Sequence, residues 1–309
     1  MNYIFAKNVS KYFSGKPILT KISFSSNAEI VALLGPNGSG KTTLLKILGG
    51  LFPPDEGDVY ICGHSVKHDY KYVRSIVSIA FPGGWIGLKF YKSVLENLIF
   101  YGKVYGLEKT EILSRAKELI ELMDLSDFQN KCIAELSDGL RQRTCLAIAL
   151  MIKTPVLLID DPTIHLDPLF VLKFCQLVRK ECDLNKRCIV IATHNPFIAR
   201  IIADKILLLK YGRAVYYGNV KDFLSKFKLQ TFEAIIEDKP KLKEIEDKLK
   251  VVSYAMLLNQ KPIKYYVKIT GYLYDEKVDI LRENLGKIVK EKIRPSNLEE
   301  IYSYVMKYV

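Results

Sequence analysis

The chain has 309 residues, 49% of them hydrophobic, and its 46 lysines and arginines outnumber its 34 acidic residues to give a formal net charge of +12. No apolar run approaches the roughly 20 residues that a membrane-spanning helix needs, and the first residues lack the pattern of a signal peptide, so we expect a cytoplasmic chain. The length suits one large or two modest domains, and the charge excess lies in residues 1–228, where a basic surface suits a phosphate site.

The chain opens with a predicted sheet region over residues 3–24, and the apolar run 30–34 predicts a buried strand. A glycine-rich turn follows, directly before the apolar helix pattern 44–48. The backbone amides of such a turn point at phosphate groups, and the positive end of the helix adds to their field. Its lysine reaches the outer phosphates and the next hydroxyl binds Mg²⁺, so the sequence predicts a site for a nucleoside triphosphate with magnesium. The turn comprises Gly35, Pro36, Asn37, Gly38, Ser39, Gly40, Lys41, Thr42 and Thr43.

A helix-rich stretch lies between this loop and the middle of the chain. The sequence predicts helices over residues 93–105 and 110–123, the second with Thr110 as its N-terminal cap. The segment Leu-Ser-Asp-Gly-Leu-Arg-Gln-Arg at 136–143 opens a further helix, whose interior 145–150 is apolar.

Two buried strands are predicted to end in polar residues. The run 155–160 ends in a pair of carboxylates, Asp160 and Asp161, and the run 189–193 ends at His194.

The order of these segments resembles that of the ATP-binding subunits of ABC transporters over about residues 1–228. The resemblance implies an α/β fold, with a P-loop NTPase core, an antiparallel β subdomain and a helical ABC subdomain over about residues 90–152. It implies an ATPase that uses ATP and Mg²⁺. The matching motifs are Walker A (35–42), the signature (136–140), Walker B (156–160), the D-loop (162–168) and the switch histidine, His194.

Residues 229–309 are predicted to form a second, small α+β domain. The tail Arg294-Pro-Ser-Asn-Leu-Glu-Glu-Ile-Tyr302 resembles that of the ABC-2 type export ATPases, although helix capping by Ser296 with Glu299 accounts for the same residues. The predicted order is a helix over 240–250, strands over 251–258 and 263–270, a helix over 276–285, a strand over 287–293 and a final helix.

The family resemblance assigns functions to individual residues. Lys41 neutralises the β and γ phosphates, while Thr42 and Asp160 hold Mg²⁺. An aromatic residue near the end of the first strand stacks on adenine, and Phe13 fits this position better than its neighbour Tyr12.

The resemblance also implies a site shared by two chains. Ser137 and the Gly139 amide would face the γ phosphate of the opposite protomer, and His194 would contact it within its own chain. Two cassettes would therefore sandwich ATP head to tail, as a homodimer or as a heterodimer with a second cassette. ATP closes such a dimer and hydrolysis releases it.

Three positions depart from the family pattern. Asp161 stands where a glutamate usually polarises the attacking water, and Phe81 stands where a glutamine usually contacts magnesium and water. His165 replaces a small residue in the D-loop. Loss of general-base alignment typically lowers a rate by 10² to 10⁴, so we expect slow hydrolysis with Asp160, Asp161 and His194 at the catalytic site. A nearby residue such as Asp167 is a possible substitute base.

The expected partner is a separate polytopic membrane subunit, with the chain at the inner face of the cell membrane. The segment 81–91 contains Trp85 and falls where the family receives a coupling helix of that subunit, although burial under the helical subdomain explains the same aromatic residues. Two alternatives are a degenerate subunit in which ATP serves mainly as a dimerisation ligand beside an active cassette, and an ABC ATPase that acts on nucleic acid. We expect no nucleic-acid partner, because relatives of that kind usually carry two cassettes in one chain.

Overall fold

The structure is a computed structural model that describes residues 2–82, 87–237, 239–258, 264–273, 275–285 and 287–309. The chain divides into two compact units, Met1–Gly218 and Asn219–Val309. This division lies ten residues before the expected boundary at 228, because helix α8 (Val220–Phe227) contacts α11 (Leu298–Tyr308) of the second unit.

A six-stranded sheet in the order β10-β9-β3-β8-β7-β6 forms the centre of the first unit. Strands β3, β6, β7, β8 and β9 pair in parallel, and every residue of β3, β7 and β8 is buried, which is why these segments are continuous apolar runs. The strands are β3 (Ile30–Leu34), β6 (Val77–Ala80), β7 (Val156–Asp160), β8 (Cys188–Thr193), β9 (Lys205–Lys210) and β10 (Arg213–Asn219).

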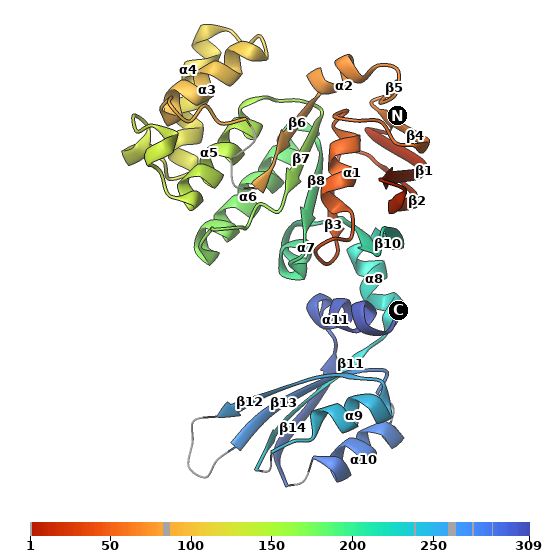
Figure 1. Ribbon diagram of the computed structural model, residues 1–309. Coiled ribbons are helices and arrows are strands. Elements are labelled where there is room, and N and C mark those ends of the chain that lie inside the picture. The colour runs from red at the N-terminus through yellow and green to blue at the C-terminus, as the bar shows by residue number, and fades with distance from the viewer. Residues whose placement is uncertain (1, 83–86, 238, 259–263, 274, 286) are drawn as a thin grey trace. The chain divides into compact units, whose positions relative to one another are not determined.

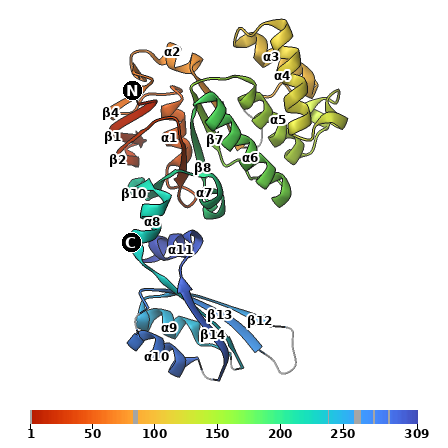
Figure 2. The ribbon, with the colours of Figure 1, turned by 180° about the vertical axis from the view of Figure 1, so that it is seen from behind.

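Two hydrophobic cores cover the two faces of this sheet. Helix α1 (Lys41–Leu48) packs on one face and α6 (Pro168–Asn185) on the other (Figures 1 and 2). Successive residues of a strand point into opposite cores. Leu158 packs in the core that contains α1, and Leu157 packs in the core that contains α6. The core around α1 also takes in a four-stranded antiparallel sheet of order β2-β1-β4-β5, formed by β1 (Ile4–Phe13), β2 (Lys16–Ser26), β4 (Glu56–Ile61) and β5 (His64–Ser65).

The helical part of the first unit gathers beside β6 (Figure 1). Ser93 caps α3 with Glu96 in a capping box. Helix α4 begins one residue earlier than expected, with Glu108 and not Thr110 at its N-cap. The helices of this part are α3 (Val94–Val104), α4 (Lys109–Leu122) and α5 (Asp138–Met151), with single turns at Ser126–Phe128 and Ile133–Glu135. Two further helices of the first unit lie elsewhere: α2 (Tyr70–Ser75) contacts β5 and β6, and α7 (Pro196–Ile202) contacts α6, β3 and β8.

The second unit is an antiparallel sheet of order β12-β13-β11-β14. Helices α9 and α10 cover one face through a core that includes Ile245, Leu281 and Phe232. Strand β11, central in this sheet, was not predicted, although Phe232, Ala234 and Ile236 alternate as a half-buried strand should. The elements are β11 (Gln230–Ile236), α9 (Leu242–Leu249), β12 (Val252–Leu258), β13 (Lys264–Gly271), α10 (Asp275–Asn284) and β14 (Ile288–Pro295).

The last helix, α11, begins one residue later than the sequence indicates. Asn297 is its N-cap and forms the capping box with Glu300, in place of the expected Ser296 and Glu299. The Ser296 hydroxyl instead lies 2.9 Å from Thr231 Oγ1 on β11. Tertiary packing of the tail on the sheet therefore shifts the cap.

Candidate functional site

The glycine-rich loop joins the end of β3 to α1. Gly38 and Gly40 have φ values of +78° and +98°, which favour glycine. A Cβ on Gly40 would come within 2.6 Å of Leu19 Cδ2, whereas a Cβ on Gly38 would meet no atom within 4 Å. Gly40 thus permits close packing of the loop on β2, while Gly38 borders open space from which a phosphate can approach the backbone.

Lys41 points back over the loop that precedes it. Its Nζ donates to the carbonyl oxygens of Gly35 at 2.8 Å and Pro36 at 3.0 Å. Burial lowers the pKa of Lys41, while nearby Asp161 and Asp160 oppose that shift. The buried Ser39 hydroxyl has no hydrogen-bond partner among the described residues. The Lys41 amine is held only by loop carbonyls, and the Ser39 hydroxyl lacks an acceptor. Both groups could donate to phosphate oxygens, so they fit a triphosphate ligand.

The first carboxylate of β7 lies against the hydroxyl that follows the lysine. Thr42 Oγ1 donates to Asp160 Oδ2 at 2.6 Å. Burial raises the pKa of Asp160 most strongly, and the neighbouring charge of Asp161 adds to this, while the Thr42 bond and Lys41 oppose it. A hard cation would hold this carboxylate in its charged form, so Thr42 and Asp160 are suitable oxygen ligands for Mg²⁺.

The second carboxylate pairs with the histidine that ends β8. Asp161 Oδ2 lies 2.7 Å from His194 Nδ1. The Asp161 backbone is in the left-handed region at φ +39°, and its amide donates to the Ala192 carbonyl at 2.8 Å, which directs the carboxylate toward β8. The imidazole is half exposed, so its other nitrogen is available to a ligand.

Lys41, Thr42, Asp160 and Asp161 line one cavity of about 320 Å³. Eight of the predicted site residues line it, and Gly35, Pro36 and Ser39 belong to the same loop. Ile18, Pro82 and Ile164 also line the cavity. Sequence reasoning missed these three, because they bring no chemical group of their own. The predicted residues in the lining are Asn37, Gly38, Gly40, Lys41, Thr42, Thr43, Asp160 and Asp161.

His194 is outside the lining but contacts Asp161, which belongs to it. Phe13, Ser137 and Gly139 also lie outside the lining and belong to other parts of the chain. Phe13 ends β1 with 47% of its surface exposed, and its ring meets Phe52 edge-on at 5.8 Å. Ser137 is the exposed N-cap of α5, and a Cβ on Gly139 would lie 2.7 Å from the His165 carbonyl oxygen. The signature therefore packs against the D-loop of its own chain, away from its own phosphate loop.

The residues that depart from the family pattern have definite environments. Phe81 is buried, lies under Lys46 Nζ at 5.8 Å from its ring centre, and is absent from the nucleotide cavity lining. The backbone of His165 in the D-loop is in the left-handed region, at φ +62°.

Asp167, the possible substitute base, accepts from the Phe170 amide as the cap of α6 and pairs with Arg143 at 2.9 Å, so it is already engaged by two groups. It is therefore poorly placed to replace Asp161 as a base.

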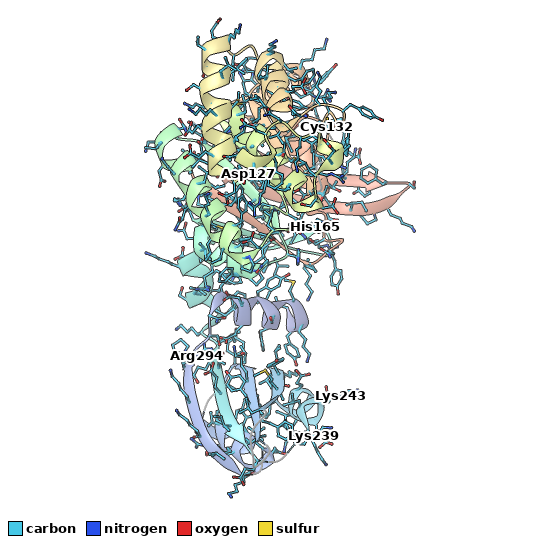
Figure 3. The ribbon with its side chains drawn as sticks, turned by 90° about the vertical axis from the view of Figure 1, so that its left-hand side faces the viewer. Asp127, Cys132, His165, Lys239, Lys243 and Arg294 are labelled. Atoms are coloured by element: carbon cyan, nitrogen blue, oxygen red, sulfur yellow. The ribbon has the colours of Figure 1, made fainter. Side chains whose placement is uncertain are left out.

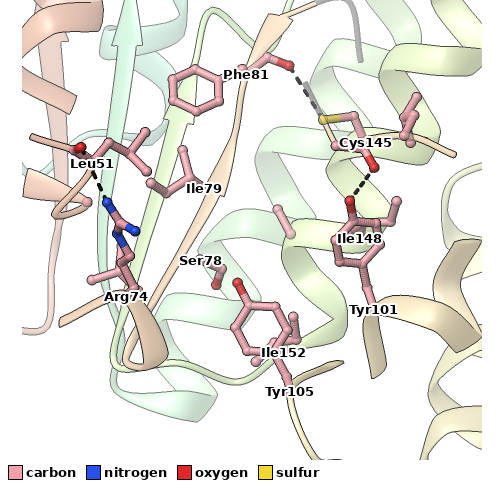
Figure 4. A pocket seen from close by; sticks show the side chains of 15 residues that line it. Leu51, Arg74, Ser78, Ile79, Phe81, Tyr101, Tyr105, Cys145, Ile148 and Ile152 are labelled. Carbon is pink, nitrogen blue, oxygen red and sulfur yellow. Dashed lines mark hydrogen bonds between the residues drawn. The ribbon is translucent and has the colours of Figure 1, made fainter. Parts of the chain in front are cut away.

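A second cavity of about 270 Å³ lies between the central sheet and the helical part (Figure 4). Its wall is mainly apolar, and Cys145 Sγ donates to the Phe81 carbonyl within it at 3.4 Å. Trp85, the expected anchor for a membrane subunit, lies outside the described residues. The wall includes Leu51, Ile79, Phe81, Tyr101, Tyr105, Ile148 and Ile152.

Comparison with known proteins identifies the family. A family model described as ABC transporter matches residues 19–164. The chain is 34% identical over 229 residues to the putative ABC transporter ATP-binding protein PF0068 of Pyrococcus furiosus, covering 72% of this chain and 87% of the relative. It is 34% identical over 221 residues to the methionine import ATP-binding protein MetN of Clostridium acetobutylicum, covering 70% and 68%. Among solved structures, the ATP-binding cassette MJ0796, in a dimer bound to ADP and Pi, matches with a TM-score of 0.64 and 31% identity over 70% of this chain and 98% of that one.

Proposed function

Because the chain belongs to the ABC transporter family as an ATP-binding subunit, and is thus an ATPase that uses ATP with Mg²⁺, we propose that it powers an exporter through a separate membrane subunit. The observation that carries the ATP-driven part of this proposal is the convergence of Lys41, Thr42 and Asp160 on one cavity, with the Asp161–His194 pair at its edge. In this assignment Lys41 neutralises the outer phosphates and Thr42 with Asp160 holds Mg²⁺, which supplies further charge neutralisation when bound.

Two chains complete each site in the proposed mechanism. Ser137 and Gly139 lie outside the lining of their own nucleotide cavity, and Ser137 is exposed at the N-terminus of α5. Such a position suits contact with the γ phosphate on the opposite cassette, where backbone amides and the helix end stabilise negative charge. Phe13 is exposed enough for its ring to stack on adenine. In this assignment the first unit, which ends ten residues before the expected boundary at 228, is the ATP-binding domain.

Slow turnover is part of the proposal. Asp161 is one methylene shorter than the usual glutamate, and His194 engages its carboxylate at 2.7 Å. A water molecule at the γ phosphate would therefore be oriented less often, and a displacement of ~1 Å can lower a rate 10²-fold.

The membrane partner is assigned to the second cavity. Its apolar wall lies at the junction of core and helical part, where the family receives a coupling helix, and buried apolar contacts of this kind supply most of the energy of an interface. Among the described residues, no helix is both long and apolar enough to cross a bilayer. We therefore place the chain at the inner face of the membrane, bound to a polytopic subunit.

Export, as opposed to import, is proposed from the tail Arg294–Tyr302 and from nothing else in the chain. The relatives include import subunits such as MetN. Reconstitution of the complete transporter in inside-out vesicles tests the direction, since an exporter accumulates its substrate there when ATP is added outside. Loss of substrate from preloaded vesicles under the same conditions would instead identify an importer.

Two measurements separate this proposal from its alternatives. The chain should copurify with a polytopic protein from detergent-solubilised membranes. Copurification with ribosomes or nucleic acid would instead favour an ABC ATPase that acts on nucleic acid. Single-turnover hydrolysis by the assembled complex should proceed slowly but measurably. Absence of hydrolysis with retained ATP binding would favour a degenerate subunit beside an active cassette.

A further inference from the structure

Helix α5, which begins at the signature, lies against the D-loop of its own chain along one side. Gly139 and Arg143 are four residues apart in α5, so they lie on the same side of the helix. A Cβ on Gly139 would lie 2.7 Å from the carbonyl oxygen of His165, and Arg143 reaches Asp167. Figure 3 labels His165 below Cys132 of the helical part. The signature end of α5 and the D-loop therefore meet at two successive turns of the helix.

The Arg143 guanidinium joins three elements of the first unit. Its Nη2 donates to Asp167 Oδ2 at 2.9 Å, at the N-terminus of α6, and its Nη1 donates to Asp124 Oδ2 at 3.4 Å, just after α4. Its central carbon lies 3.9 Å from the ring centre of Phe170. Lys173 of α6 also pairs with Asp124, at 2.5 Å. A planar guanidinium that is stacked on a ring and bonded at both Nη atoms has little freedom to move.

The opposite end of α5 is held by a different group of residues. Arg115 of α4 pairs with the buried Glu181 of α6 and donates to a carbonyl in the last turn of α5. At the signature end, by contrast, the Asp124 and Asp167 side chains are 50% and 52% exposed. Exposed ion pairs add little to the stability of a fold. The contacts of Arg143 are therefore better suited to directing the signature end of α5 than to holding the unit together.

A small change in the direction of α5 moves the signature far enough to matter. Without Arg143, the helix could tilt about the end that Arg115 holds. Ser137 lies 13 residues from Leu150, about 20 Å along the axis, so a tilt of about 3° displaces the signature by ~1 Å, and a displacement of this size can lower a rate 10²-fold.

Arg143 itself is turned away from the nucleotide site of its own chain. It does not line the nucleotide cavity, and both of its Nη atoms face carboxylates of its own chain. We propose that Arg143 is a positioning residue, which holds α5 on the D-loop and so sets where the signature (136–140) meets the γ phosphate bound to the opposite chain. The inference rests on the proposed function, because it presupposes a site that two chains share.

Arg143→Gln tests this function by separating dimer formation from nucleotide binding. Light scattering with Mg-ATP should show the Kd of the dimer raised at least about tenfold, because each dimer contains two signatures. The affinity of the dilute, monomeric chain for ATP should stay within about twofold, because the phosphate loop is unchanged. Arg143→Lys should give an intermediate Kd, since an ammonium keeps the charge but lacks the planar fork that contacts both carboxylates.

Arg179→Gln is the matched control. Arg179 also pairs with two partly exposed carboxylates, Asp183 at 3.7 Å and Asp204 at 3.1 Å. It lies about three turns beyond Asp167 along α6, so its loss should leave the Kd of the dimer within about twofold. Similar thermal stability of the two variants would show that the effect of Arg143→Gln does not come from unfolding.

A mixing experiment identifies the chain on which Arg143 acts. Lys41→Ala damages the phosphate site of its own chain and leaves its signature intact. In a mixed dimer with Arg143→Gln, one site therefore combines an intact phosphate loop with an intact signature. With a donor dye on one variant and an acceptor dye on the other, Mg-ATP should raise energy transfer to within about twofold of that between the native chain and Lys41→Ala, which share the same single intact site.

The possible failures are distinguishable. A native chain that stays monomeric at saturating Mg-ATP overturns the shared site, and this inference with it. If the native chain dimerises but Arg143→Gln dimerises equally well, or binds ATP more weakly as a monomer, only the function assigned to Arg143 is overturned. Energy transfer that Mg-ATP does not raise in the mixture of variants, while it rises for the native chain with Lys41→Ala, has the same meaning.

Discussion

At the residue scale, the contact between Asp161 and His194 fixes the direction of the Asp161 carboxylate at the nucleotide cavity. The histidine occupies one carboxylate oxygen at 2.7 Å, and Thr163 Oγ1 approaches the other at 3.5 Å. Both oxygens are therefore directed toward their own chain. A longer side chain from the same backbone position would extend past these partners toward the cavity.

We expect Asp161→Glu to raise kcat about tenfold or more, because the carboxylate advances by about 1.5 Å, one C–C bond, toward the attacking water. The affinity for ATP should change little, since the carboxylate acts chiefly on the water. Steady-state hydrolysis by the assembled transporter measures both quantities.

Asp161→Asn is the matched control for this position. It should lower the residual rate further if Asp161 still acts as the base. If Asp161→Glu leaves kcat unchanged while Asp161→Asn is harmless, the residue is not catalytic, and hydrolysis depends on a partner cassette.

At the scale of single elements, buried charge clusters join segments that are distant in sequence. Arg187, directly before β8, is 1% exposed, and its Nε donates to the Thr154 carbonyl at 2.8 Å. Glu181 of α6 lies 3.4 Å from Arg187 and 2.6 Å from Arg115 of α4. Burial lowers the pKa of Arg187 to about 10, against the attraction of Glu181. This cluster ties the helical part to the core of the first unit.

Glu181→Gln should therefore reduce the free energy of unfolding by about 3 kcal/mol or more, because the buried Arg187 and the largely buried Arg115 lose their shared carboxylate. Glu118→Gln is the matched control. Glu118 also pairs with Arg115, but its side chain is 50% exposed, so we expect a change within about 0.5 kcal/mol. Urea denaturation measures both, and equal effects would contradict a special contribution from Glu181.

In the second unit, Glu300 links separate elements as Glu181 does in the first. It connects α11 to β11 and β14. Burial alone would raise its pKa, but bonds from Arg294, a backbone amide and Lys268 lower the pKa of Glu300 to about 2. A lowered folded-state pKa stabilises the fold above the ordinary value of 4.5, and this stabilisation disappears as the pH falls toward 2.

Hydrogen exchange in residues 230–236 should therefore accelerate between about pH 4.5 and 2 in the native chain, beyond the change in intrinsic exchange rate. Glu300→Gln should exchange faster at neutral pH and lose most of this additional pH dependence, because Gln cannot ionise. Glu283→Gln, an exposed change on α10, is the control and should behave as the native chain. An unchanged pH dependence in Glu300→Gln would show that another group is responsible.

At the scale of the whole molecule, the composite site predicts assembly that depends on ATP. The phosphate loop and the signature lie apart within one chain, and ABC cassettes work as dimers. Light scattering should show that Mg-ATP raises the dimer fraction, most clearly while hydrolysis is slow. A chain that stays monomeric at saturating ATP would contradict the sandwich arrangement.

Lys41→Ala should abolish this ATP-dependent increase by removing neutralisation of the phosphates. The same light-scattering titration, with and without Mg-ATP, measures this loss.

The sequence alone determined the nucleotide site, because its chemistry depends on short segments. The loop 35–43 contains its glycines, lysine and hydroxyl in consecutive positions, and strand ends such as Asp160 and His194 are marked by apolar runs before them. The structure places most of these residues around one cavity, as expected for parallel strands that end at the same edge of a sheet.

Tertiary structure decided what depends on contacts between distant segments. The pairing of Asp161 with His194, the engagement of Asp167 by Arg143 and the shift of the last helix cap to Asn297 involve partners that no local pattern specifies. Strand β11 was missed for a related reason. Its short alternation is a weak signal by itself, and it becomes a central strand only because β13 and β14 pair with its two edges. Local order follows from neighbouring residues, whereas strand pairing, buried charge and the rows of a sheet face arise only when separate segments come together.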